Sequence, residues 1–291
     1  MSEPSVSEPS SLDAEEINSV EDVSVENSVS VRKPFLHPLR VIFSSILLTI
    51  WCLLMLLIHL CWRLLHIPKI EKCYFVFHWG CCYLFNLHCK VKGQLSTARP
   101  TLFLSNHISY LDVFVLGRYI PAFFIAKSEV SSWPIFGWLV KKQNTLFFER
   151  NSKKVCHQLA IMSAHFNQQN NLILFPEGTS TDGVHVKAFK SSLLQSVESA
   201  DRDVIIQPVT LAYTRYQNKI MSRQMLDQYA WYAKMPFVSH FFSVLGMGRV
   251  EVELIFHPPV TLAEFDSRKD CAQYCQHQVS LGLANALREC H

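Results

Sequence analysis

The sequence lacks the patterns that mark several common enzyme and binding classes. It has no Gly-x-Ser-x-Gly, so the nucleophile turn of most serine hydrolases is missing. It has thirteen histidines but no His-Glu-x-x-His and no tight ligand cluster, which argues against a metal site. Its ten cysteines include no Cys-x-x-Cys pair with a matching partner, which argues against a zinc ribbon. No nucleic-acid-binding motif is present, and no nucleic-acid partner is expected.

Charge is also scarce, and it is unevenly distributed. Charged residues make up 18% of the chain and hydrophobic residues 49%, which suggests membrane contact. Residues 1–31 hold eight acidic residues and no Lys or Arg. The chain's 24 acidic residues less these eight leave 16 in the remainder, against all 27 basic residues. A body with this excess of 11 positive charges suits an anionic membrane surface or phosphate-bearing substrates.

The first 31 residues are rich in Ser, Glu and Val, and we expect a disordered acidic tail there. They lack the basic start and early apolar core of a signal peptide. The cysteines follow no disulfide framework, and six of them fall between Cys52 and Cys89. We therefore expect buried, reduced thiols in a protein that faces the cytoplasm.

An uncharged run from Val41 to Trp62 predicts a membrane helix. Its 22 residues would span about 33 Å as a helix, enough to cross a bilayer core of about 30 Å. A buried helix of a globular domain is the alternative. Cations lie on both sides and leave the orientation undecided. They are Arg32, Lys33 and Arg40 before the run, and Arg63, Lys69 and Lys72 after it.

A second uncharged stretch, Cys73–Cys89, has three readings. It could lie in the membrane interface, return through the bilayer, or form a buried helix of the globular domain. We therefore assign residues 32–90 to membrane-binding helices and residues 91–291 to a second, larger domain.

From Gly93 onward, short apolar runs alternate with longer helical ones. This alternation predicts an α/β domain with a mixed, largely parallel sheet flanked by helices. The expected strands are Thr101–Ser105, Ala122–Ala126, Leu146–Glu149, Asn171–Phe175, Val204–Ala212 and a half-buried Val250–Phe256. The expected helices are Tyr110–Tyr119, Ser152–Gln169, Ala188–Ala200 and Arg268–Glu289.

A histidine and an aspartate follow the first of these strands. His107 and Asp112 would lie on different faces of a regular helix, so they meet only if His107 lies in the turn and Asp112 begins the helix. A carboxylate on one imidazole nitrogen fixes the tautomer and supports a proton on the other, as a general base requires. A purely structural pairing is the alternative.

Two further strand ends carry polar groups. After Leu172–Phe175, the segment Pro176-Glu177-Gly178-Thr179-Ser180 predicts a tight turn with a carboxylate and with backbone N–H groups for an anion or oxyanion. The strand Leu146–Glu149 ends at Arg150, whose planar side chain could bind a phosphate. An ordinary loop and a surface ion pair are the alternatives.

Together these motifs resemble the glycerolipid acyltransferases, most closely the bacterial 1-acylglycerol-3-phosphate acyltransferases. The motifs are His107-x4-Asp112, Phe147–Arg150, Phe175–Thr179 and Ile206–Val209, in the family's order and approximate spacing over residues 90–215. The resemblance implies a membrane enzyme that transfers a fatty acyl group to a lysolipid hydroxyl. It implies acyl-CoA or acyl carrier protein as co-substrate and no other cofactor.

The resemblance also implies roles for individual residues. His107 would take the proton from the acceptor hydroxyl, and Asp112 would orient His107. Three residues of the third motif would place the acceptor, and Arg150 would bind its phosphate. The three are Glu177, Gly178 and Thr179. The expected acceptor is 1-acyl-sn-glycerol-3-phosphate, which would give phosphatidic acid, at an inner cell membrane with the catalytic domain facing the cytoplasm.

Two departures from the family pattern weaken that choice of acceptor. Ser180 stands where the third motif usually has Arg, and Asn144 stands where the second usually has Gly. Lys187 or Lys190 could replace the missing charge. The run Thr181–Ser191 is more similar to members that acylate other lysolipids, such as lyso-ornithine lipid. A non-catalytic membrane adaptor with this fold is the alternative of a different class.

Overall fold

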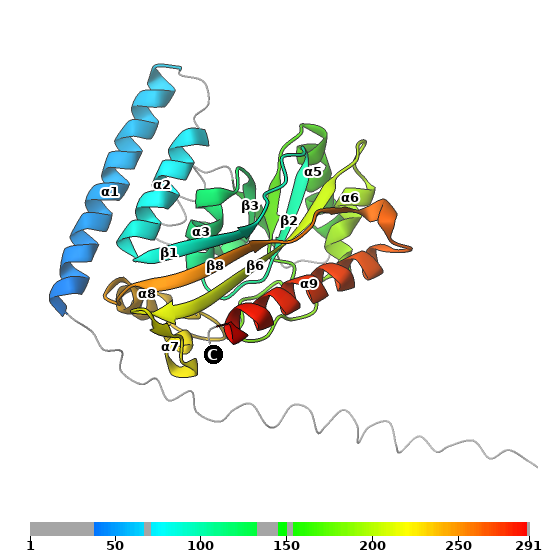
Figure 1. Ribbon diagram of the computed structural model, residues 1–291. Coiled ribbons are helices and arrows are strands. Elements are labelled where there is room, and N and C mark those ends of the chain that lie inside the picture. The colour runs from blue at the N-terminus through cyan, green and yellow to red at the C-terminus, as the bar shows by residue number, and fades with distance from the viewer. Residues whose placement is uncertain (1–37, 67–70, 133–144, 150–153, 290–291) are drawn as a thin grey trace, which may run out of the picture. The chain divides into compact units, whose positions relative to one another are not determined.

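A mixed sheet forms the centre of the protein (Figure 1). The computed structural model describes residues 38–66, 71–132, 145–149 and 154–289, and within them the sheet has nine strands. Its main path runs β1-β8-β6-β2-β5-β3-β4, and the short strands β7 and β9 pair with β6. The strands from β6 to β4 are parallel, whereas β8 runs antiparallel to β6 and parallel to β1. This is the predicted α/β class, and the acidic tail expected over 1–31 lies outside the described residues.

The strands are β1 (Leu87–Gly93), β2 (Thr101–Ser105), β3 (Phe123–Lys127), β4 (Leu146–Phe148), β5 (Leu172–Leu174), β6 (Ile205–Tyr216), β7 (Lys219–Ile220), β8 (Val250–Phe256) and β9 (Val260–Thr261). The helices are α1 (Pro38–Leu64), α2 (Glu71–Leu84), α3 (Leu111–Tyr119), α5 (Val155–Asn167), α6 (Gln195–Glu198), α7 (Arg223–Tyr229), α8 (Phe237–Leu245) and α9 (Arg268–Arg288). Short 3-10 turns span Ser128–Ser132, Ser191–Leu194 and Leu262–Glu264.

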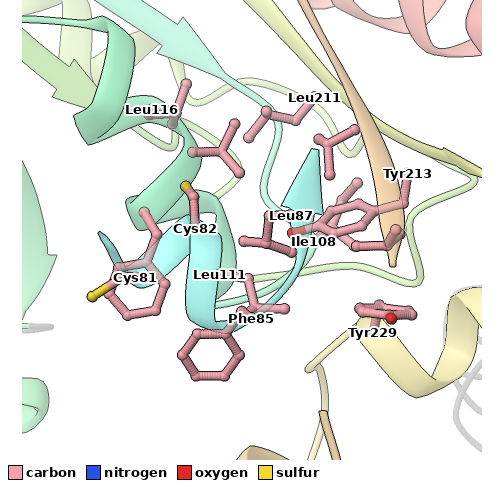
Figure 2. Close-up of a cluster of buried hydrophobic side chains, with 14 of the residues drawn as sticks. Cys81, Cys82, Phe85, Leu87, Ile108, Leu111, Leu116, Leu211, Tyr213 and Tyr229 are labelled. Carbon is pink, nitrogen blue, oxygen red and sulfur yellow. The ribbon is translucent and has the colours of Figure 1, made fainter. Parts of the chain in front are cut away.

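Helices cover both faces of the sheet, because side chains alternate along each strand. On β2, Phe103 points into one core while Leu102 and Leu104 point into the other. The first core joins the sheet to α2, α3, α7 and α8, and the second joins it to α5, α6 and α9. Figure 2 shows the first core, where side chains of α2 and α3 meet Leu211 and Tyr213 of β6.

Helix α1 is long, apolar and mostly unburied. Its 27 residues would extend about 40 Å, and only 17% of its most apolar window is buried. Among the described residues it is the one helix with the length and composition to cross a membrane. It packs on α2, where Trp51 Nε1 donates to Phe77 O at 3.2 Å and a Cβ at Gly80 would clash with the Trp51 ring. This helix associates the protein with membranes.

The stretch Cys73–Cys89 divides into a helix and a strand. Helix α2 ends at Leu84, Asn86 takes a positive φ of 53°, and β1 begins at Leu87. Cys81 and Cys82 of α2 are buried in the first core, whereas Trp79 and Tyr83 of the same helix are exposed. The sheet therefore starts before residue 91.

Strand β8 was expected to be half buried, and this is wrong. Glu251 and Glu253 are only 6% and 7% exposed, because β1 lies beside them and supplies cations. Lys90 Nζ lies 2.7 Å from Glu251 Oε2, and Lys92 Nζ lies 2.9 Å from Glu253 Oε2. Strand β1 and helices α7 and α8 are further elements that the sequence pattern does not predict.

Candidate active site

His107 lies in the loop between β2 and α3, at the carboxyl end of a strand whose five residues are all buried. The preceding residue fixes this loop to the sheet. Asn106 Nδ2 donates to Leu211 O at 2.9 Å, and Leu211 N donates to Asn106 Oδ1 at 2.8 Å. Both hydrogen bonds join the end of β2 to β6, so the backbone entering His107 is held rigidly.

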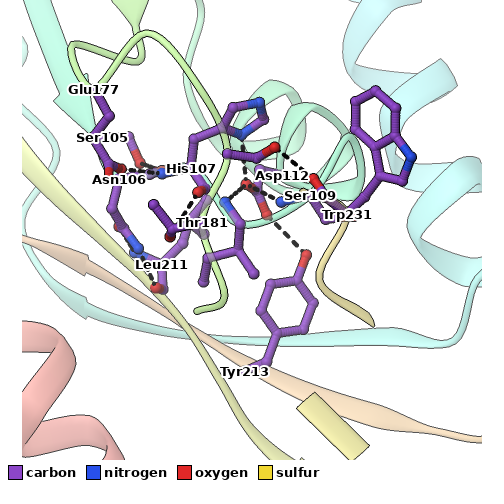
Figure 3. A network of polar contacts seen from close by, with 12 residues as sticks. Ser105, Asn106, His107, Ser109, Asp112, Glu177, Thr181, Leu211, Tyr213 and Trp231 are labelled. Carbon is purple, nitrogen blue, oxygen red and sulfur yellow. Dashed lines mark hydrogen bonds and ion pairs between the residues drawn. The ribbon is translucent and has the colours of Figure 1, made fainter. Parts of the chain in front are cut away.

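His107 and Asp112 meet in the way that their spacing requires. His107 is in the turn, Asp112 is in the first turn of α3, and His107 Nδ1 lies 2.9 Å from Asp112 Oδ2 (Figure 3). The same oxygen accepts hydrogen bonds from the backbone N–H groups of Ile108 and Ser109, at 2.7 and 2.9 Å. The aspartate therefore both closes the turn and binds the imidazole.

Tyr213, which no motif in the sequence indicates, completes the hydrogen bonding of the aspartate. Its hydroxyl donates to Asp112 Oδ1 at 2.9 Å from β6, 101 residues away in the chain. Burial, and then the nearby Asp112, raise the pKa of Tyr213, so the phenol stays protonated and can donate. Asp112 is fully buried and accepts from four donors, as an ionised carboxylate would.

The imidazole has one protected side and one accessible side. Its ring stacks on Phe175 with centroids 4.0 Å apart, and its side chain is 20% exposed. Because Nδ1 points at a carboxylate that is bonded to three other donors, Nδ1 carries the proton and Nε2 has the lone pair. This arrangement can accept a proton at Nε2.

Glu177 lies on the other side of the His107 backbone. Its Oε1 accepts from His107 N and its Oε2 from Lys187 N, both at 2.8 Å, and the residue is 4% exposed. Burial raises the pKa of Glu177 to about 7, although both backbone hydrogen bonds favour the charged form. The carboxylate thus joins the two loops that meet at the histidine.

The rest of the third motif forms the turn beside Glu177. Gly178 has a positive φ of 71°, and its N–H is already bonded to Phe175 O at 3.1 Å. Thr179 and Ser180 are half buried, and the Ser180 hydroxyl donates to Trp231 O. A Cβ at Gly178 would lie 2.8 Å from Lys190 Nζ, so this ammonium lies over the turn. Lys187 is exposed.

Arg150 lies outside the described residues, as does Asn144. Glu149, at the end of β4, is exposed and pairs with Lys154 at 2.7 Å. Among the residues that the structure describes, no group of three or more His, Cys, Asp or Glu side chains could hold a metal ion. The nine cysteines of the described ranges are free thiols.

Comparison with known proteins places these features in context. A family model described as Acyltransferase matches residues 87–212, which include β2, the His107 loop, the Glu177 turn and most of β6. The lyso-ornithine lipid O-acyltransferase of Rhodobacter capsulatus is 33% identical over 72% of this chain and 74% of its own length.

Two further proteins are more distant. The 1-acyl-sn-glycerol-3-phosphate acyltransferase of Neisseria gonorrhoeae is 27% identical over 57% of this chain and 63% of its own length. The crystal structure of the 1-acyl-sn-glycerophosphate (LPA) acyltransferase PlsC from Thermotoga maritima superimposes with a TM-score of 0.60 at 19% identity. That likeness covers 85% of this chain and 94% of the other, and it shows a shared fold.

Proposed function

Since the chain belongs to the acyltransferase family, we propose that it transfers a fatty acyl group from an acyl thioester to the hydroxyl of a lysolipid. The observation that carries this proposal is the bond between His107 Nδ1 and Asp112 Oδ2, 2.9 Å long, at the end of a buried strand. It leaves Nε2 as the base on the accessible side of the ring. Acyl-CoA or acyl carrier protein supplies the acyl group.

In the proposed reaction, Nε2 of His107 takes the proton of the acceptor hydroxyl while the oxygen attacks the thioester carbonyl carbon. The tetrahedral intermediate then collapses, the carbon–sulfur bond breaks, and the imidazolium gives its proton to the leaving sulfur, which departs as the thiol and returns His107 to its neutral form. Asp112 stabilises that imidazolium and keeps Nδ1 protonated. No acyl-enzyme forms, so the enzyme acts by proximity and general base catalysis.

The third motif supports this reaction in two ways. The Gly178 amide is engaged within its own turn, so the Thr179 amide is the candidate of the two for stabilising the oxyanion. Glu177 is expected to position His107 and the Lys187 loop through their backbones, and to act on the acceptor through them. Arg150 remains a proposed phosphate ligand from the sequence pattern alone.

We propose lyso-ornithine lipid as the first acceptor to test, ahead of 1-acyl-sn-glycerol-3-phosphate. The R. capsulatus enzyme that acylates it is more similar to this chain than the N. gonorrhoeae enzyme is. The site offers a physical reason as well. Ser180 has no charge, and its hydroxyl is turned to Trp231 O, so this position gives nothing to a phosphate dianion. An ornithine head group has no phosphate to bind.

The test is turnover by protein purified in detergent, with a labelled acyl thioester and each acceptor separately. We expect transfer to lyso-ornithine lipid at least about tenfold faster than to 1-acyl-sn-glycerol-3-phosphate, as one lost charged hydrogen bond would give. His107→Ala should abolish transfer, whereas His277→Ala, an exposed histidine of α9, should not. The reverse preference would restore 1-acyl-sn-glycerol-3-phosphate as acceptor. No transfer to any lysolipid would support the adaptor.

We also infer that the enzyme works at an inner cell membrane with its catalytic domain in the cytoplasm, where acyl thioesters are available. Cys156 on α5 is exposed and reports the side. In wild type, a membrane-impermeant maleimide should label Cys156 only after the inner membrane is permeabilised. In the Cys156→Ser variant this labelling should be absent. Labelling of intact spheroplasts would contradict the cytoplasmic orientation.

A further inference from the structure

A cavity lies away from the candidate active site, at the β1 edge of the sheet. It has a volume of about 320 Å³ and is lined by residues of α2, β1, β8 and the last turn of α3. Asp112 and Arg118 belong to opposite ends of α3, about 9 Å apart along the helix axis. None of the residues proposed to act in acyl transfer lines this cavity.

The cavity contains more positive than negative charge. Lys90, Arg118 and Arg249 line it, and Glu251 is the one carboxylate among its lining residues. Lys90 Nζ lies 2.7 Å and Arg249 Nη2 lies 3.4 Å from the Glu251 carboxylate. One carboxylate cannot balance three cations, and two positive charges remain.

Arg118 is the cation most available to a ligand. No carboxylate of the described ranges forms an ion pair with it, and its guanidinium lies 5.2 Å from the ring of Tyr119. His88 also lines the cavity. Burial and the nearby Arg249 lower the pKa of its imidazole, so His88 favours the neutral form and adds no positive charge. β1 is the terminal strand of the described sheet, so its outer edge can offer backbone N–H groups as well.

One wall of the cavity is aromatic and open to solvent. Trp79 and Tyr83, on successive turns of α2, are 51% and 72% exposed. Their rings stack with centroids 6.1 Å apart and an interplanar angle of 14°. Exposed Trp and Tyr are enriched where proteins meet the head-group region of a bilayer. Helix α2 also packs on α1, the apolar helix that associates the protein with membranes.

From these observations we propose that the cavity between α2, β1 and Arg118 binds the anionic head group of a membrane phospholipid, separately from the acceptor site. Arg118 and Arg249 bind the phosphate, and the acyl chains of the lipid extend out of the cavity along Trp79 and Tyr83. A soluble phosphate would satisfy the two arginines but would make no use of the aromatic wall. We therefore expect the ligand of this cavity to be a lipid.

The test counts lipids bound to the full-length protein in detergent by native mass spectrometry, which requires no turnover. Dioctanoyl phosphatidylglycerol should bind at least about tenfold more tightly than dioctanoyl phosphatidylcholine, given two excess positive charges in a partly desolvated cavity. The double variant Arg118→Gln/Arg249→Gln should lose about tenfold in affinity or more. Arg202→Gln removes an exposed arginine elsewhere and should bind as wild type does.

Two further variants separate the lipid from other anions and from misfolding. Trp79→Ala should weaken phosphatidylglycerol binding and leave inorganic phosphate binding unchanged. Glu251→Gln frees Lys90 and Arg249 and should tighten phosphatidylglycerol binding several-fold. Thermal unfolding followed by circular dichroism identifies any variant that fails to fold. If Arg118→Gln fails to fold, Arg118→Lys, which keeps the charge, replaces it and should give an intermediate affinity.

Two results would overturn the proposal. One is phosphatidylglycerol binding that the folded Arg118→Gln/Arg249→Gln variant retains. The other is coenzyme A or inorganic phosphate binding to the same Arg118-dependent site more tightly than phosphatidylglycerol, which would assign the cavity to a soluble phosphate.

Discussion

Two buried carboxylates flank His107, and they are built differently. Asp112 is fully buried, bonds the imidazole and accepts three further hydrogen bonds, two from backbone amides and one from a phenol. Glu177 bonds only backbone N–H groups, one on His107 and one on Lys187, and burial raises its pKa to about 7. The first carboxylate controls the proton on the ring, and the second controls where the ring's backbone lies.

This difference teaches that a motif's carboxylate need not touch the reacting atoms to be required. A charge that holds an imidazole in one tautomer acts on every turnover, because the wrong tautomer has no base at Nε2. A carboxyl group that holds a loop acts indirectly, by fixing where the imidazole lies, and its loss is partly compensated when the loop relaxes. The effects of removing each should therefore differ in size.

Asp112→Asn should produce the largest effect. Because the Oδ2 position also accepts from two backbone N–H groups, the amide oxygen of Asn would take that position and the amide nitrogen would face Tyr213. The imidazolium would then lack the negative charge that stabilises it, and kcat should fall by about 10³-fold or more. Steady-state kinetics of acyl transfer measure this directly. Asp201→Asn, an exposed aspartate bonded to Asn167, is the matched control and should keep wild-type turnover. A kcat within about tenfold of wild type for Asp112→Asn would remove the orienting role.

Glu177→Gln should have a smaller effect on activity and a distinct effect on stability. One of its two backbone acceptors becomes a donor, which leaves an amide unsatisfied and should lower kcat/KM by about 10- to 100-fold. Wild-type Glu177 has a folded-state pKa of about 7 against an ordinary 4.5, so the folded state holds its proton over that range while the unfolded state does not.

Because of that pKa shift, the stability contributed by protonated Glu177 is complete below pH 4.5 and is lost as pH rises through about 7. The change amounts to at most about 3 kcal/mol in the free energy of unfolding. Denaturant unfolding in detergent at pH 5, 6 and 7 should show this decline in wild type, and Glu177→Gln should remove it. An equal decline in both proteins would mean that another group titrates.

Tyr213→Phe tests the Asp112 side without touching His107. Removing the phenol leaves Asp112 Oδ1 without its donor, and we expect kcat to fall about tenfold with KM unchanged. Tyr229→Phe is the matched control, since Tyr229 stacks on Tyr213 at 5.9 Å but donates its hydroxyl to Gly248 O. Equal losses of kcat in both variants would indicate general destabilisation of the core.

The Tyr213 contact also marks the limit of what the sequence predicts. Short-range features were predictable: strand Thr101–Ser105, strand Val250–Phe256, and a histidine in the turn with its aspartate at the helix start. Contacts over long chain separations were not. Nothing local to Tyr213 indicates that it faces Asp112, 101 residues away.

The burial of β8, which the sequence predicts wrongly, has the same physical cause. The alternation of Glu251 and Glu253 with apolar residues indicates a half-buried strand. In the structure β1 pairs beside them, and Lys90 and Lys92 neutralise the two carboxylates. β1 itself was hidden because its first residues continue the uncharged run of α2. The positive φ at Asn86 that separates the two elements has no distinct signal in the sequence.

The smallest expected effect concerns Lys190, on the Glu177 side. Its ammonium lies over the Gly178 turn, whereas the backbone of Lys187 is bonded to Glu177 and its side chain is exposed. If Lys190 attracts an acidic acceptor, Lys190→Gln should raise the acceptor KM by about three- to fivefold with kcat unchanged, and the effect should shrink with added salt, as for other exposed charges.

Lys187→Gln carries the same change in charge three residues away and should alter KM by less. An equal effect of both variants would assign the attraction to the general positive field of the protein, and a KM that Lys190→Gln leaves unchanged would remove Lys190 from acceptor binding.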